Sequence, residues 1–251
     1  MQRKDIPLNE RIIFALDVGS FDESKALVKE LEGHIKFYKV GLQLFLASWF
    51  QAIDWLNERG HKVMADLKFF DVPETVKLAV RQLKDRGVAF ATVHGNDPIM
   101  RAAVSETGPE AGRDDGLKIL AVTLLTSFGS EDMEEFFGHP IDIEDYVLAR
   151  ARRALKVGCH GIISSGLEAK RLRDDLGGNF LVVTPGIRPG ANITVEEKDD
   201  QKRIVTAGRA IADGADYAVV GRPIRDAADP VAVVKEMQQE IARAAGSGCR
   251  D

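Results

Sequence analysis

The chain has 251 residues, of which 45% are hydrophobic, and this is enough for one large domain with a sizeable buried core. Its formal net charge is -5, and no basic run is long enough to suggest a nucleic-acid or membrane surface, so we expect neither kind of partner. The two cysteines, Cys159 and Cys249, fit neither a disulfide framework nor a metal site, and a reducing cytoplasm is the expected setting.

In chain order, residues 1–9 come first; they lack the apolar region of a signal peptide, and we expect them to fray. No later stretch approaches the roughly 18 apolar residues that cross a bilayer. Eight short apolar, β-branched runs follow, at residues 11–18, 35–40, 62–69, 88–94, 118–126, 161–166, 180–187 and 217–221. Segments with a helical period lie between them, among them residues 24–32, 73–87 and 143–158, and the tail after about residue 245 is expected to fray.

This alternation predicts parallel strands that helices bury on both faces. Eight units in 251 residues match one (β/α)₈ TIM barrel, so we predict a single α/β domain over residues 1–251 with an ordered core at about 10–245. A doubly wound open sheet is the alternative. Its dinucleotide-binding form usually has a G-x-G-x-x-G fingerprint after the first strand, whereas this chain reads "ALDVGSFDESKA" there.

Polar residues follow the predicted strands at the end where barrels carry their active sites. In chain order they are Asp17, Lys39, Asp66 with Lys68, His94, Thr126 with Ser127, Ser164 with Ser165, Arg188 and Arg222. Each one alone is equally consistent with a helix cap or a solvated side chain. Together they favour an active site, because neighbouring parallel strands bring their carboxyl ends to one rim.

The stretch "DLKFFD" at residues 66–71 has the densest charge of these strand ends. Asp66 and Lys68 are two residues apart on a strand, so we expect their side chains on one face. Lys39 on the adjacent strand, and Asp71 in the following loop, would extend the pair into an alternating row. Such a row keeps the ammonium groups protonated, as an acid catalyst at neutral pH requires.

Two further stretches suggest a phosphate site. "TPGIRPG" after the seventh strand and "VGRPI" after the eighth supply glycine amides, Arg188 and Arg222 where barrels commonly bind a phosphoryl group. Ordinary tight loops with solvated arginines are the alternative interpretation. Residues 188–201 are long and polar, which is typical of a mobile lid over a ligand, although a plain flexible loop has the same composition.

In combination these motifs resemble the orotidine 5'-phosphate decarboxylase family. The resemblance runs through "FALD" at 14, "YKVG" at 38, "DLKFFDVPETV" at 66, "AVTLLTS" at 121, "TPGIR" at 184, "DDQKRI" at 199 and "VVGRPI" at 219. It implies a lyase that converts orotidine 5'-monophosphate to uridine 5'-monophosphate and carbon dioxide, without a metal or an organic cofactor.

The resemblance also implies a role for each matching residue. Lys68 would stabilise the C6 carbanion and protonate it, beside Asp66 and Lys39. Asp17 and Lys39 would bind the ribose, and Thr126 would lie by the pyrimidine. The phosphate would be held by Arg188, Gln201, Gly221 and Arg222. Asp71 and Thr75 would contact the nucleotide of a partner subunit, which implies a homodimer with shared active sites.

Departures from the family pattern are small. The usual "DIPNTV" reads "DVPETV", so Val72 and Glu74 replace an isoleucine and an asparagine, and we assign Glu74 no site role. His94, Ser164 and Ser165 are interpreted as structural residues of the rim.

Two other functions remain as alternatives. A related group of magnesium-dependent enzymes acts on sugar phosphates with the same D-x-K-x-x-D barrel, but it needs a carboxylate after the second strand, where this chain has Lys39. A barrel that only binds a nucleotide would need the phosphate loops but not the charged row, whose burial costs stability.

Overall fold

The structure is a computed structural model that describes residues 4–108, 116–190 and 203–246. Eight parallel strands pair in sequence order, and β1 pairs with β8 to close the barrel. The strands are β1 Ile12–Ala15, β2 Phe37–Gly41, β3 Lys62–Phe69, β4 Phe90–Val93, β5 Lys118–Val122, β6 Gly161–Ile163, β7 Leu181–Thr184 and β8 Tyr217–Val220. The predicted (β/α)₈ barrel is therefore confirmed, and an open doubly wound sheet is excluded.

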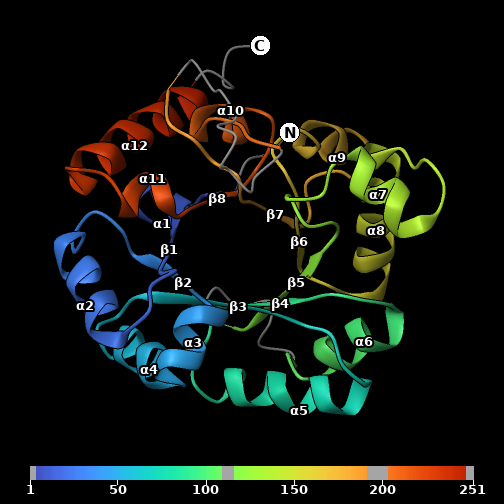
Figure 1. Cartoon of the computed structure of the whole chain (residues 1–251), viewed down its shortest axis with the longest axis horizontal. Coiled ribbons are helices and arrows are strands. Elements are labelled where there is room, and N and C mark those ends of the chain that lie inside the picture. The colour runs from blue at the N-terminus through green and yellow to red at the C-terminus, as the bar shows by residue number, and fades with distance from the viewer. Residues whose placement is uncertain (1–3, 109–115, 191–202, 247–251) are drawn as a thin grey trace.

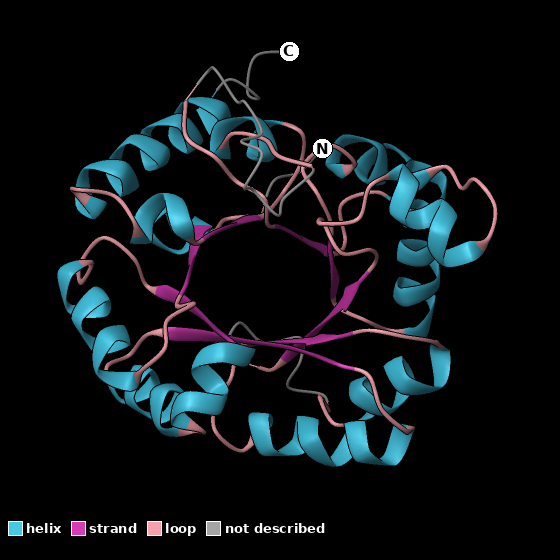
Figure 2. Ribbon diagram, in the orientation of Figure 1, coloured by secondary structure: helices cyan, strands magenta, loops and turns pink. Residues whose placement is uncertain are grey.

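Helices surround this ring of strands on the outside (Figure 1, Figure 2). They are α1 Leu8–Arg11, α2 Phe21–Glu30, α3 Leu42–Ser48, α4 Gln51–Glu58, α5 Pro73–Lys84, α6 Asp97–Ser105, α7 Ser130–Phe137, α8 Ile143–Val157, α9 Ala169–Leu176, α10 Ala207–Ala212, α11 Arg222–Arg225 and α12 Pro230–Gly246. Within the described ranges, no helix combines the length and apolar character that a bilayer span needs.

Local sequence signals account for where several helices begin and end. The side chains of Ser20, Asp142 and Thr206 each accept a hydrogen bond from a backbone N–H in the first turn of α2, α8 and α10. At the other end, α8 stops at Gly158, whose φ of +105° is a conformation that glycine adopts without strain. The three helical segments expected from the sequence are thus present as α2, α5 and α8.

Two apolar layers result from the alternation of side chains along the strands. The larger layer packs between the strands and the helices, while a smaller cluster fills the barrel interior. Three rings, Phe37, Phe90 and Tyr217, meet in that interior with centroids 4.9 to 5.6 Å apart. These rings, each the first residue of its strand, form an apolar plug at the amino-terminal side of the barrel interior. Other side chains therefore fill the interior at the carboxyl ends of the strands.

The opposite, amino-terminal end of the barrel is closed by a buried ionic cluster around Asp216. Its carboxylate lies 3.0 Å from Lys4 Nζ and 2.7 Å from Arg173 Nη2, and its backbone carbonyl accepts a hydrogen bond from Arg11 at 3.1 Å. Lys4 and the first residues of α1 precede residue 10, and the ion pair with Asp216 ties Lys4 to the barrel. No local pattern in the sequence reveals this long-range contact.

Candidate active site

A cavity of about 530 Å³ opens at the carboxyl ends of the strands. That size lies within the range of small-molecule sites. Its lining comes from the ends of β1, β2, β3, β5, β6, β7 and β8 and from the loops that follow them. The lining residues are Ala15, Asp17, Lys39, Met64, Asp66, Lys68, Val122, Leu124, Leu125, Thr126, Ser127, Ile163, Pro185, Gly186, Arg188, Val219, Gly221, Arg222 and Arg225.

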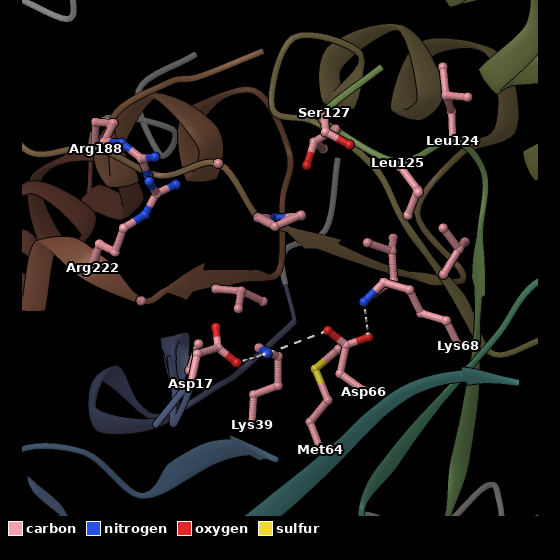
Figure 3. Close-up of a pocket in the computed structure, with 18 of the residues that line it drawn as sticks. Asp17, Lys39, Met64, Asp66, Lys68, Leu124, Leu125, Ser127, Arg188 and Arg222 are labelled. Carbon is pink, nitrogen blue, oxygen red and sulfur yellow. Dashed lines mark hydrogen bonds and ion pairs between the residues drawn. The ribbon is translucent and has the colours of Figure 1, made fainter. Parts of the chain in front are cut away.

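Four charged side chains form an alternating row across one wall of this cavity (Figure 3). Lys39 Nζ lies 2.8 Å from Asp17 Oδ1 and 3.6 Å from Asp66 Oδ2. Lys68 Nζ lies 2.9 Å from Asp66 Oδ1. The predicted row of Lys39, Asp66 and Lys68 is therefore present, and Asp17 extends it at the end away from Lys68.

Strand register explains how residues far apart in sequence meet here. Ala15 pairs with Lys39 across β1 and β2, and Gly41 pairs with Asp66 across β2 and β3. Lys39 lies two residues after Phe37, and Asp66 two residues after Met64, so both side chains face the barrel interior directly above its apolar plug. Lys39 is 7% exposed, and its ammonium group therefore depends on the two carboxylates for compensation.

The electrostatics of Asp66 and Lys39 favour the charged form of each. Burial alone would raise the pKa of Asp66, but the ammonium groups of Lys39 and Lys68, with hydrogen bonds from Lys68 and Thr92, outweigh it and lower this pKa. Burial alone would lower the pKa of Lys39, but the charges of Asp66 and Asp17 outweigh that effect and raise it. Each partner thus holds the other in its charged form.

Across the cavity from this row, Arg188 and Arg222 point toward one another (Figure 3). Arg188 lies in the loop after β7, and Arg222, the first residue of α11, is separated from β8 only by Gly221. Gly221 lines the cavity beside them. A third guanidinium, that of Arg225, donates a hydrogen bond of 2.8 Å to the backbone carbonyl of Asp17 and so ties this rim to the charged row.

Most of the sequence-predicted site residues meet in this one cavity. Those that line it are Asp17, Lys39, Asp66, Lys68, Thr126, Ser127, Arg188, Gly221 and Arg222. Asp71 and Thr75 do not line the cavity of their own chain; both are exposed, on the loop after β3 and at the start of α5. The first interpretation of Asp71 as another member of one local row is therefore wrong, because the chain turns outward after Phe69. Gln201 and most of the predicted lid lie outside the described residues.

The three predicted rim residues lie beside the cavity and do not line it. Ser164 donates a hydrogen bond of 3.1 Å to Glu168, whose other oxygen forms a buried ion pair of 2.7 Å with Arg203. Ser165 accepts a hydrogen bond from the N–H of Leu167. His94 packs edge-on against the ring of Phe70 with centroids 5.8 Å apart.

Sequence reasoning missed two residues that shape the site. Arg225 lines the cavity, but it lies one helical turn beyond the strand end, where the pattern of polar strand-end residues does not reach. Gly41 belongs to the motif "YKVG", which predicts no role for it. A Cβ at this position would lie 2.9 Å from Lys39 Nζ and 3.0 Å from Asp17 Oδ1, so any other residue would displace the ends of these two side chains. The available signal in the sequence was a glycine, Gly41, two residues after the strand-end lysine Lys39.

The part of the chain that the structure describes contains no group of three or more His, Cys, Asp or Glu side chains placed to hold a metal ion. In the charged row, the space between Asp17 and Asp66 is occupied by the ammonium of Lys39. A cation fixed there opposes the approach of a second cation.

The family model described as "Orotidine 5'-phosphate decarboxylase / HUMPS family" matches residues 10–237. A protein of Methylococcus capsulatus named orotidine 5'-phosphate decarboxylase is 50% identical over 242 residues, 96% of each chain. One of the same name from Rhodopseudomonas palustris (strain BisB5) is 42% identical over 244 residues, covering 97% of this chain and 100% of the relative. A solved orotidine 5'-phosphate decarboxylase from Lactobacillus acidophilus superposes with a TM-score of 0.78 at 32% identity, over 92% of this chain and 98% of that one. This chain belongs to the orotidine 5'-phosphate decarboxylase / HUMPS family.

Proposed function

We propose that this chain is an orotidine 5'-phosphate decarboxylase, which converts orotidine 5'-monophosphate to uridine 5'-monophosphate and carbon dioxide in pyrimidine biosynthesis. The names of its relatives, at up to 50% identity over almost the whole chain, support this reaction. The observation that carries the proposal is the row Asp17, Lys39, Asp66 and Lys68 in a cavity whose far rim holds two arginines. The setting we propose is the cytoplasm, in line with two cysteines that suit no disulfide framework.

The proposed orientation of the substrate follows from charge. Its phosphate lies at Arg188, Arg222 and the backbone of Gly221, because guanidinium groups and exposed amides are the preferred partners of phosphate oxygens. The ribose hydroxyls then meet Asp17 and Lys39. The pyrimidine lies toward Thr126 and Lys68, with C6 beside the ammonium. Gln201, whose position is not described, is assigned to the phosphate on sequence resemblance alone.

The chemical difficulty of the reaction explains why Lys68 is central. When the bond from C6 to the carboxylate breaks, the electron pair stays on C6 in an sp² orbital that no adjacent π-system can delocalise. A fixed ammonium beside C6 stabilises that charge electrostatically. Lys68 then transfers a proton to C6, which completes uridine 5'-monophosphate, and regains a proton from water.

Asp66 and Lys39 hold the acid in place in this mechanism. Asp66 accepts a hydrogen bond from Lys68 Nζ, and its lowered pKa keeps it anionic at neutral pH. Lys39 stabilises Asp66 from the other side and remains protonated, since its own pKa is raised. Binding energy from the distant phosphate organises this arrangement, and such remote contacts commonly raise the rate of the chemical step.

The direct test is the loss of orotidine 5'-monophosphate absorbance with the purified chain, with and without EDTA. We expect turnover that EDTA does not change. Lys68→Ala should remove turnover while leaving binding of uridine 5'-monophosphate largely in place, and Lys170→Ala, at a lysine exposed on α9, serves as the matched control. Activity only with Mg²⁺ and a sugar phosphate would contradict the proposal, as would full turnover by Lys68→Ala.

We also propose that the enzyme is a homodimer in which each active site receives Asp71 and Thr75 from the partner. Exposed apolar side chains support this: Leu42, Leu46 and Trp49 on and after α3, and Phe70 and Val72 before α5, are 57 to 75% exposed. These residues follow the adjacent strands β2 and β3, and Phe70 and Val72 flank the exposed Asp71 in sequence. A concentration of apolar side chains of this kind marks an interaction surface.

A mixing experiment tests the shared site. Lys68→Ala and Asp71→Ala should each be nearly inactive alone. In a 1:1 mixture allowed to exchange subunits, half of the dimers are mixed, and one of their two sites has both wild-type residues. Activity should therefore return to about a quarter of the wild-type value, as symmetry requires. No recovery, despite subunit exchange seen by mass spectrometry, would contradict a site that uses the partner's Asp71.

A further inference from the structure

The two residues of the charged row that come from β3 lie in an irregular part of the sheet. β3 and β4 pair at Ala65 with Ala91 and again at Phe69 with Val93, and the register shifts between these two positions. Residues 66–68 on β3 therefore face a single residue of β4, Thr92. Such a bulge interrupts the ladder of backbone hydrogen bonds, so the groups that it leaves unpaired need other partners.

The backbone of Lys68 is strained within this bulge. Its φ is +48°, and among the described residues only Trp49 is another non-glycine residue with positive φ. This left-handed conformation is energetically unfavourable for residues with a Cβ, and a lysine side chain makes no local interaction that offsets the cost. Strain of this kind persists only where surrounding contacts enforce it.

Thr92 supplies those contacts with one hydroxyl group. Its Oγ1 accepts a hydrogen bond of 2.9 Å from the backbone N–H of Lys68 and donates one of 2.9 Å to Asp66 Oδ1. The same Oδ1 accepts the 2.9 Å hydrogen bond from Lys68 Nζ. Thr92 is fully buried, and its side chain faces the barrel interior two residues after Phe90. The hydroxyl thus connects the backbone of Lys68 to the carboxylate that its ammonium binds.

We propose that Thr92 is a positioning residue for the decarboxylation, which holds the strained backbone of Lys68 and the carboxylate of Asp66 in a fixed mutual geometry. This inference rests on the proposed function of Lys68. A hydroxyl suits the position because it donates and accepts a hydrogen bond at the same time. Valine has the same shape but would leave the Lys68 N–H without its acceptor and Asp66 without one of its donors.

The test compares Thr92→Val, Thr92→Ser and wild type by steady-state kinetics. Thr92→Val should lower kcat about a hundredfold, the usual effect of a displacement near 1 Å at a reacting group. KM and the affinity for uridine 5'-monophosphate should change by less than about threefold, since the phosphate contacts supply most binding. Thr92→Ser keeps the hydroxyl and should restore kcat to within about fivefold of wild type.

Thr184→Val is the matched control. Thr184 is also fully buried on a barrel strand, β7, and its Oγ1 has no hydrogen-bond partner among the described residues. This change should leave kcat unaltered. If Thr92→Val does not fold, Thr92→Cys replaces it, because cysteine has the shape of serine with a larger sulfur atom, and its thiol is a weaker donor and acceptor. Serine should then give a clearly higher kcat than cysteine.

The outcomes separate this inference from the proposed function. No turnover of orotidine 5'-monophosphate by the wild-type chain would refute the function itself. Normal wild-type turnover with an unchanged kcat in Thr92→Val would refute only the role of Thr92. A loss of kcat that serine does not restore, or that Thr184→Val shares, would show that Thr92 acts only through general packing, and this too would overturn the proposal.

Discussion

At the scale of single residues, the site depends on a lysine that is buried only because two carboxylates accompany it. A charged lysine that is only 7% exposed is unfavourable by itself, and Lys39 is stabilised here by Asp17 at 2.8 Å and Asp66 at 3.6 Å. Gly41, which has no side chain, leaves room for the ends of the Lys39 and Asp17 side chains.

Gly41→Ala should lower kcat/KM for orotidine 5'-monophosphate by about tenfold to a hundredfold, because the new Cβ would push Lys39 or Asp17 out of position. Backbone strain does not contribute, since φ at Gly41 is -94°. The measurement is steady-state kinetics beside a thermal melt. Gly19→Ala is the matched control: its Cβ would approach no atom closer than 4.0 Å. Equal activity of the two variants would show that the space at Gly41 is not needed.

At the scale of elements, β3 contributes to two different surfaces. Its interior side chains, Asp66 and Lys68, serve the cavity of the same chain, whereas the loop that follows it turns outward and exposes Phe70, Asp71 and Val72. On the neighbouring α3, Leu42 and Leu46 are four residues apart and so share one face of the helix. We interpret this combined surface as the contact between two subunits.

Leu46→Glu should shift the oligomer toward monomers, because a charge on an apolar contact surface opposes association. It should not unfold the monomer, because Leu46 is 75% exposed in the single chain. Sedimentation velocity at micromolar concentration gives the oligomeric state, and circular dichroism checks the fold. Activity should fall together with the dimer fraction. Leu167→Glu, at a leucine that is 56% exposed on the opposite part of the barrel after β6, should change neither. A dimer that persists in Leu46→Glu would argue against this surface.

At the scale of the whole molecule, the two ends of the barrel have separate tasks. The carboxyl end carries the cavity, and the amino end carries the ionic cluster of Lys4, Arg11, Arg173 and Asp216. The aromatic plug of Phe37, Phe90 and Tyr217 separates them. Substitutions at the amino end should therefore change the free energy of unfolding but leave kcat unchanged, as is usual for barrels of this kind.

Asp216→Asn should reduce the free energy of unfolding by about 3 to 5 kcal/mol, since it leaves the buried Arg173 guanidinium without its counter-charge. The kcat of the folded protein should stay within about twofold of wild type, because the aromatic plug separates this cluster from the cavity. Urea unfolding and kinetics at low temperature measure the two effects. Asp174→Asn breaks an exposed ion pair with Lys170 instead and should change neither quantity measurably. A large fall in kcat for Asp216→Asn would contradict the separation of tasks.

The charged row makes stability depend on pH in two separate windows. The pKa of Asp66 is lowered from 3.8, so its contribution is present above that pH and is lost as the pH falls through the folded-state pKa. The pKa of Lys39 is raised from 10.5, so its contribution is present below that pH and is lost as the pH rises through the folded-state value.

The unfolding free energies of wild type and Asp66→Asn should therefore differ by a constant amount between about pH 5 and about pH 9, and the difference should shrink in acid as the carboxyl group takes up its proton. Denaturant titrations at a series of pH values measure it. A difference that grows in acid would mean that the pKa of Asp66 is raised in the folded protein.

The barrel and most of its site could be predicted from the sequence because both depend on local regularities. Alternation along a strand sets which face a side chain takes, and the strand end sets which rim it reaches, and this was sufficient for Lys39, Asp66, Arg188 and Arg222. The positive φ of Lys68 lies within the bulge against β4, which is a contact between strands, and the exposure of Asp71 depends on the path of the chain after β3. Lys4 lies outside any local pattern because its partner, Asp216, is 212 residues away.

The pairing of β1 with β8 determines when the barrel can be completed during protein synthesis. While the ribosome still holds the last strand, the nascent chain has open parallel edges on β1 and β7, and Lys4 and Arg11 lack their partner Asp216. Such an edge can pair with other chains until Tyr217–Val220 emerges and closes the ring. Translation that stalls before residue 217 should therefore yield an aggregating fragment, whereas in a chain that contains β8 each of the eight described strands is paired on both sides.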